Sequence, residues 1–265
     1  MAESFFGGLG VIAASAVVNA TYPWPIKCAR AWRWENTWLV FTVLALLAIP
    51  WGAAFIVAPG FARLLSTVPA GELAPGFALG CLWGLAQVSF GVSLGMVGMA
   101  MAFAILVGVS TVIGSAVPLA LLQPGELGGP RGAALAVSAA ILAAGLALYA
   151  RAAGERDAQA PSGNFGKGLA LCLFTGALAG FINLGFAFSG DLLLRAASLG
   201  ANPLQATFAV WPVVLAGGAV PNLAYTAYLM VKNRSARLYL EAPARDGALA
   251  AAAAVLWIAG VFGYG

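Results

Sequence analysis

Long apolar runs separated by short breaks dominate the chain. Each run is about 20 residues long, the length that an α-helix needs to cross the hydrocarbon core of a bilayer. The breaks carry charges or Pro and Gly, and they leave eight predicted spans, at residues 5–25, 37–57, 75–95, 99–121, 132–150, 168–189, 206–230 and 247–264. The pattern therefore predicts an all-α, polytopic membrane helix bundle.

One clearly polar segment, residues 151–167, divides the chain and is typical of a linker. Five predicted spans precede it, and after an odd number of spans a second copy of the same unit enters the membrane upside down. Such inverted repeats are common in secondary transporters. We therefore predict a first five-helix repeat at 1–150, a cytoplasmic linker at 151–167 and a second repeat at 168–265. The second holds three spans and ends without a flanking charge, so we expect two further helices to be missing from this chain.

The composition agrees with a membrane protein. Hydrophobic residues make up 62% of the 265 residues and charged residues only 8%, whereas a soluble domain is about 25% charged. The 13 Lys and Arg exceed the 9 Asp and Glu, but this excess lies in short connectors and forms no basic face for a nucleic acid. No nucleic-acid partner is expected.

The positions of the cations predict an orientation, because basic connectors stay in the cytoplasm. One set of alternate connectors holds ten cations and the other holds three. The ten are Lys27, Arg30, Arg33, Arg151, Arg156, Lys167, Lys232, Arg234, Arg237 and Arg245; the three are Arg63, Arg131 and Arg195. The N-terminus is therefore predicted to lie outside, and the connector after the first span inside.

Several kinds of chemistry are excluded. The chain contains no His, which removes His-based triads, H-E-x-x-H zinc sites and haem ligation by His. Its three cysteines, Cys28, Cys81 and Cys172, are far apart and predict neither a disulfide framework nor a C-x-x-C metal site. An enzyme is not expected, and neither is a metal or a cofactor.

Ionisable residues occur only near the predicted span ends, where Glu35 and Asp191 are the candidates for proton coupling. Glu35 precedes the second span by two residues. Its alternative role is a carboxylate at a helix N-terminus that neutralises Arg30 or Arg33. Asp191 and Arg195 are four residues apart, so an ordinary surface ion pair is the alternative there.

Uncharged polar and aromatic groups inside the spans are the candidates for substrate binding. They are Asn19, Tyr22, Trp83, Gln87, Asn183, Trp211, Asn222 and Tyr225. An amide in hydrocarbon must find a partner, so these amides either join helices or face a wet cavity. Amides combined with aromatic planes suit a neutral polyol, such as a sugar, better than an ion.

Helix breakers occur in the second and seventh spans, each the second helix of its predicted unit. The second span contains Ile49-Pro50-Trp51-Gly52, and the seventh contains Trp211-Pro212 and the run from Gly217 to Asn222. Matched broken helices in two halves indicate a transporter site.

Several of these motifs resemble one family. They are Pro25-Ile26-Lys27, Trp32-x-Trp34-Glu35-Asn36-x-x-Trp38, Pro50-Trp51, Trp83-Gly84, the Gly91–Gly98 stretch with Gly108, Gly114 and Pro118, and the run from Trp211-Pro212 through Gly217-Gly218, Pro221-Asn222 and Tyr225 to Lys232-Asn233. Together they look like the L-rhamnose-proton symporter family of the drug/metabolite transporter superfamily. The resemblance implies ten helices in two inverted repeats, and proton-driven uptake of a deoxyhexose across a bacterial inner membrane.

The leading hypothesis is therefore a sugar-proton symporter that works by alternating access, with the sugar, the proton and membrane lipid as partners and a homodimer as one assembly to consider. Two alternatives stay open. The same superfamily fold supports export of a drug or metabolite, and a non-transporting membrane scaffold is the third hypothesis.

Overall fold

The computed structural model describes residues 2–97, 99–157, 165–241 and 243–264, and every element within these ranges is a helix. The first part contains α1 (Ala2–Thr21), α2 (Pro23–Cys28), α3 (Trp34–Thr42), the π-helix η1 (Val43–Ala48), α4 (Ile49–Val57), α5 (Phe61–Thr67), α6 (Ala70–Val97), α7 (Met99–Leu122), η2 (Pro124–Glu126) and α8 (Pro130–Asp157). The second contains α9 (Phe165–Ala179), α10 (Phe181–Ala187), α11 (Gly190–Ser198), α12 (Pro203–Asn233), η3 (Ser235–Arg237), α13 (Leu238–Glu241) and α14 (Ala244–Tyr264). The all-α prediction is confirmed for these ranges. Residues 158–164 of the predicted linker lie outside them.

Six segments of the described chain are long and apolar enough to cross a membrane. They are Trp34–Val57, Ala70–Phe90, Ala104–Leu122, Gly166–Ser198, Pro203–Asn233 and Ala244–Gly263. Each overlaps a predicted span, and together they indicate an integral membrane protein. The other two predicted spans, 5–25 and 132–150, fall on α1 with α2 and on α8. The count of eight spans and the inverted repeats stay predictions.

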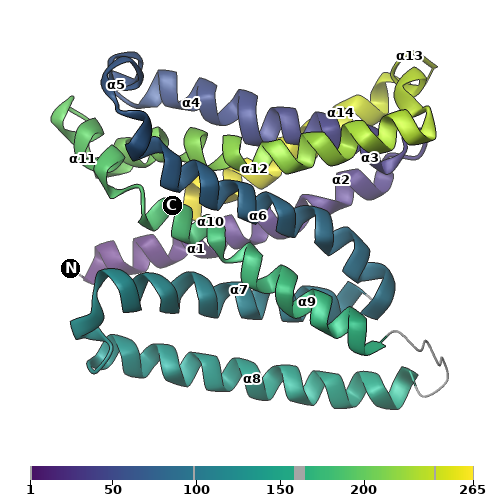
Figure 1. Ribbon diagram of the computed structural model, residues 1–265, viewed down its shortest axis with the longest axis horizontal. Coiled ribbons are helices and arrows are strands. Elements are labelled where there is room, and N and C mark those ends of the chain that lie inside the picture. Colours follow the sequence, from purple (N-terminus) through teal and green to yellow (C-terminus); the bar gives the residue numbers. More distant parts are fainter. Residues whose placement is uncertain (1, 98, 158–164, 242, 265) are drawn as a thin grey trace.

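The connectors alternate between the two ends of the bundle. Figure 1 shows α2 and α13 at one end, and α5 and α11 at the other. We call the first the basic end, because the predicted cytoplasmic cations Lys27, Arg30, Arg33, Lys232, Arg234, Arg237 and Arg245 belong to its connectors. Arg63 and Arg195 lie at the opposite end, in α5 and α11. The predicted separation of cations by end therefore agrees with the fold.

Helix α12 is the centre of the bundle. In its most apolar stretch 61% of the residues are buried inside the protein, against 17% for the corresponding stretch of α7. Glycines on α12 and α6 let these two backbones meet: a Cβ on Gly80 would strike the carbonyl of Val214, and one on Gly217 would strike the carbonyl of Phe77. Small residues allow such close approach between membrane helices, so α6 and α12 form a tightly packed central pair.

Helices from the two predicted repeats interleave. The central pair itself joins α6 of the first to α12 of the second, α1 packs against α14, and α9 packs against α6 and α7. The α7–α9 contact relies on two glycines of the sixth predicted span, since Gly176 lies against Val109 and Gly180 against Ile113. The two predicted repeats, residues 1–150 and 168–265, therefore pack into one another and do not form separate bodies.

The predicted helix breaks fall differently from the expectation. In the second span, the π-helix η1 comes directly before Pro50, and the Ile49 amide donates to the carbonyl of Leu44, five residues back. Proline has no N–H and crowds the preceding turn, which explains the local irregularity. The seventh span was expected to be broken, but α12 runs unbroken through Pro212 and Pro221, because packing along its buried length outweighs the local cost. The sixth span is interrupted instead, between α9 and α10 at Gly180.

Candidate functional site

An aromatic cluster fills the bundle between α3, α6, α12 and α14. We call it the aromatic core; its buried rings are Trp38, Phe41, Trp83, Trp211 and Trp257. Trp83 stacks on Trp257 with ring centroids 5.8 Å apart, and Trp38 stacks on Phe41 at 4.8 Å. Two predicted site residues, Trp83 and Trp211, thus belong to one cluster with three rings that were not predicted as site residues.

Asn222 joins three helices beside the aromatic core. Its side chain is 1% exposed. Its Oδ1 accepts a hydrogen bond from Trp38 Nε1 at 2.8 Å, and its Nδ2 donates to the carbonyl oxygens of Gly218 at 2.9 Å and Gly84 at 3.3 Å. Both polar atoms of the amide are used within the protein, so in this conformation Asn222 connects α12 to α3 and α6.

Two buried side-chain atoms of the membrane spans, on Trp211 and Thr42, lack a hydrogen-bond partner among the described residues. Trp211 is 3% exposed, and its Nε1 has no hydrogen-bond partner among the described residues; the same holds for Oγ1 of Thr42, which is fully buried. The Trp211 ring packs against Phe186 with centroids 4.9 Å apart. A buried N–H without an acceptor is costly, and a hydroxylated ligand could supply the acceptor that Trp211 lacks.

The two predicted tyrosines flank the aromatic core. Tyr22 follows α1 and stacks on Phe41 at 5.8 Å. Tyr225 lies one turn beyond Asn222 on α12 and meets the edge of Trp34 at 6.1 Å. Five of the eight predicted binding residues, Tyr22, Trp83, Trp211, Asn222 and Tyr225, are therefore in or beside one cluster.

The other three predicted amides lie elsewhere. Asn19 donates from Nδ2 to the carbonyl of Trp257 at 3.3 Å and fastens α1 to α14. Asn183 is half-buried and packs against Gly114 of α7. Gln87 is half-buried on α6 and makes no hydrogen bond within the described part of the chain. Asn19 behaves as a helix connector, the alternative that the sequence left open.

Glu35 lies in a hydrogen-bonded network at the basic end. It is 4% exposed, and its Oε1 accepts from Nδ2 of Asn233 at 2.9 Å and from Oγ of Ser235 at 2.8 Å. No salt bridge joins it to Arg30 or Arg33 within the described residues. The carboxylate thus connects the start of α3 to the end of α12.

The same network extends through Asn36 and Tyr239. Asn36 donates from Nδ2 to the carbonyl of Ser235 at 3.0 Å, and the Tyr239 hydroxyl donates to the carbonyl of Asn36 at 3.0 Å. Burial raises the pKa of the Tyr239 phenol, and the charge of Glu35 acts in the same direction. The phenol therefore stays protonated and keeps its role as a donor.

Asp246 makes a second connection at this end. It is 3% exposed, and its Oδ2 accepts from the backbone amides of Ala31 at 2.7 Å and Trp32 at 2.8 Å. Trp32 in turn meets the edge of Tyr239 at 4.9 Å. Two buried carboxylates, Glu35 and Asp246, therefore hold the connector before α3 against the connector between α12 and α14.

At the opposite end, Arg195 pairs with a residue that the sequence did not suggest. Its guanidinium binds both carboxylate oxygens of Glu72 at the start of α6, with Nη2 2.6 Å from Oε1. No salt bridge joins Asp191 to Arg195 in the described residues. The charge of Asp191 still acts on Arg195, but the direct, bidentate partner is Glu72. Asp191 itself is exposed on α11.

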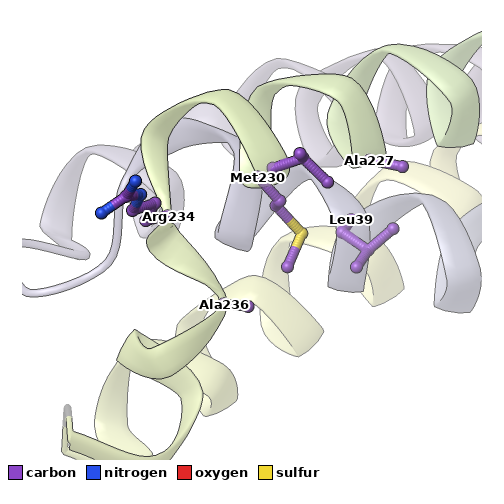
Figure 2. Close-up of a pocket in the computed structure, with 6 residues that line it drawn as sticks. Leu39, Ala227, Met230, Arg234 and Ala236 are labelled. Carbon is purple, nitrogen blue, oxygen red and sulfur yellow. The ribbon is translucent and has the colours of Figure 1, made fainter.

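A surface hollow of about 580 Å³ lies away from the aromatic core. It is lined by Leu39, Ala227, Met230, Val231, Arg234 and Ala236. Figure 2 shows Arg234 at one end of this row of side chains and Ala227 at the other. None of the ten predicted site residues lines it.

The sequence missed Glu72, Asn233, Ser235 and Asp246 as site residues because each lies in or next to a connector. A signal existed for Asp246, which follows Pro243 at the start of an apolar run, as a carboxylate at a helix N-terminus does. Its partners could not be read from the chain, because Ala31 lies 215 residues away.

Comparison with known proteins identifies the family. The profile described as L-rhamnose-proton symport protein (RhaT) matches residues 5–263. Relatives named L-rhamnose-proton symporter include one from Cronobacter sakazakii, 29% identical over 217 residues, and one from Yersinia pestis, 28% identical over 225 residues. These alignments cover 80% and 82% of this chain, but 63% and 66% of the relatives. The chain thus spans just under two thirds of their length.

No solved structure matches the chain. The family match covers nearly all of the sequence, including the Trp-rich start of α3, the aromatic core and the whole of α12. This chain belongs to the L-rhamnose-proton symport protein family.

Proposed function

We propose that this protein takes up a neutral deoxyhexose, L-rhamnose or a close relative, together with a proton across the bacterial inner membrane. The observation that carries the proposal is the family match over residues 5–263, with relatives that are named for this transport. Six helices that are long and apolar enough to cross a membrane support the proposal. The N-terminus would lie in the periplasm, with the basic end in the cytoplasm.

The sugar would bind at the aromatic core. Trp83 and Trp211 offer rings on which the C–H faces of a sugar stack, and the unpaired Nε1–H of Trp211 offers a donor to a hydroxyl or ring oxygen. Asn222 would exchange its bonds to the Gly84 and Gly218 carbonyls for bonds to sugar hydroxyls. Tyr22 and Tyr225 border this site. Gln87, Asn183 and Asn19 have weaker support, because no described contact joins their side chains to the rings of the aromatic core.

Alternating access would open the two ends in turn. The basic end is held by Glu35 and Asp246, and the opposite end by the pair of Glu72 and Arg195. Both sets of bonds are formed in this conformation, as in an occluded state. Movement around the tightly packed α6–α12 pair would break one set while the other stays closed.

Glu35 is the stronger candidate for proton coupling. Its oxygen accepts bonds from Asn233 and Ser235 that are stronger when the carboxylate is ionised, so protonation would weaken the hold on the basic end. Asp191 remains a second candidate, but it is exposed and would couple less directly to a conformational change.

The transport itself is tested by uptake of labelled L-rhamnose into proteoliposomes with and without an imposed pH gradient. We expect L-rhamnose to accumulate inside the proteoliposomes only when the pH is lower outside than inside. Uptake that is the same with and without the gradient would contradict proton coupling. If the folded protein neither binds nor takes up rhamnose, the proposed substrate is wrong.

Glu35→Gln separates coupling from binding. The amide preserves an oxygen acceptor for Ser235 but cannot ionise, so we expect gradient-driven accumulation to fall by at least about tenfold, as for loss of a required proton carrier. Exchange of labelled for unlabelled rhamnose should persist. Asp191→Asn is the matched control, and equal loss in both variants, or none in Glu35→Gln, would contradict the assignment.

A further inference from the structure

The hollow at the basic end combines apolar walls with cationic side chains. Leu39, Ala227, Met230, Val231 and Ala236 form the walls, and Arg234 closes one end (Figure 2). Val231 is 80% exposed, and Leu240 nearby on α13 is 92% exposed. This surface therefore lies on the outside of the bundle, where lipid surrounds the end of a membrane-spanning helix.

The charges beside the hollow leave an excess of cations. Arg234 has no salt bridge in the described chain, and Nζ of Lys232 lies 5.7 Å from the centroid of the Tyr228 ring. The nearby carboxylates are engaged elsewhere: Glu241 pairs with Arg237 at 3.9 Å, and Glu35 is buried against Asn233 and Ser235. An anionic group beside Arg234 would thus meet complementary charge.

The backbone of Arg234 adds an independent observation. Arg234 ends α12 with φ +50°, in the left-handed region, and it is the one described residue other than Gly with a positive φ. Glycine is strongly favoured at such a helix end because a Cβ is strained there. An Arg that occupies a glycine position accepts this strain, which suggests a role for its side chain.

We propose that the hollow binds one anionic phospholipid of the cytoplasmic leaflet, such as phosphatidylglycerol. An acyl chain lies along Met230, Val231 and Leu39, and the phosphate is held by Arg234, while Lys232, two residues earlier on α12, adds positive charge at the same helix end. Headgroups lie at the ends of membrane helices, and clustered Lys and Arg at that depth attract anionic lipids. The apolar walls favour a lipid over a free anion, because a soluble phosphate has no group to cover them.

The test compares phosphatidylglycerol with phosphatidylcholine of identical acyl chains, added to the purified full chain in detergent. Native mass spectrometry counts retained lipid, and thermal unfolding measures stabilisation. We expect one phosphatidylglycerol to be retained, with a preference over phosphatidylcholine that falls about fivefold in Arg234→Gln, as expected for one cation near a membrane surface. Arg63→Gln, an exposed cation at the opposite end, should keep the full preference.

Arg234→Gly separates the side chain from the backbone. It removes both the cation and the left-handed strain, so the variant should fold at least as stably as the parent and still lose the lipid preference. Equal binding of phosphatidylcholine, an unchanged preference in both Arg234 variants, or equal stabilisation by glycerol phosphate alone would overturn the proposal. These readouts do not depend on rhamnose transport, so either proposal can fail without the other.

Discussion

Asn222 has a structural role in the bundle and is also a proposed binding residue. Asn222 is 1% exposed, and its side-chain amide makes hydrogen bonds to Trp38, Gly84 and Gly218. A buried amide was predictable as important, because hydrocarbon offers it no partner. Its partners were not predictable: Trp38 lies 184 residues away and Gly84 lies 138 residues away, so only tertiary packing brings them together.

Asn222→Ala should destabilise the protein by about 1–3 kcal/mol, because it removes three hydrogen bonds and leaves Trp38 Nε1 buried and unpaired. Unfolding of the detergent-solubilised protein by heat or by a denaturing detergent measures the change. Gln87→Ala is the matched control, since that half-buried amide makes no hydrogen bond within the described residues. A similar loss of stability in the two variants would contradict a special structural role for Asn222.

At the scale of elements, the sequence located the helices well and their irregularities poorly. Apolar run length is a local property, so the predicted span 99–121 corresponds closely to α7 at Met99–Leu122. The prolines and glycines of the seventh span predict a broken helix. In the structure, Gly217 and Gly218 of the continuous helix α12 instead allow contact with α6. Whether a glycine bends a helix or admits a neighbour depends on what lies opposite, which the sequence does not state.

The surroundings of two glycines, Gly80 in the α6–α12 contact and Gly145 on α8, predict opposite outcomes for Gly→Ala substitutions. In Gly80→Ala the new methyl would strike the Val214 carbonyl, and overpacking of this kind costs about 1–3 kcal/mol. In Gly145→Ala nothing lies within 4 Å of the new methyl, so higher helix propensity should stabilise α8 by about 0.5–1 kcal/mol. Thermal unfolding of both variants checks the signs; stabilisation by Gly80→Ala would show that the backbones do not touch.

For the whole molecule, the alternation of connectors between two ends was predictable from the cations, but the packing partners were not. The sequence predicts two consecutive repeats, while the fold packs α6 on α12, α7 on α9 and α1 on α14. Under the proposed alternating access, each moving part would therefore contain helices from both predicted repeats.

The predicted orientation can be checked by labelling single cysteines with a membrane-impermeant maleimide in intact cells. In a background that lacks Cys28, Cys81 and Cys172, Arg63→Cys in α5 should react from outside. Arg30→Cys, at the basic end, should react only after the membrane is permeabilised. The reverse pattern would invert the topology without changing the fold.

The pairing of α1 with α14 also bears on how the chain is made. The amide of Asn19 on α1 reaches its acceptor, the Trp257 carbonyl, only after 238 further residues have been synthesised. At typical elongation rates of about 5–20 residues per second, that interval is roughly 12–48 s. In the predicted eight-span topology α1 would enter the bilayer before α14 is made, so the Asn19 amide would lack this acceptor during that interval. We therefore expect the Asn19 amide to bond a temporary partner until α14 is made, such as the insertion machinery or a lipid headgroup.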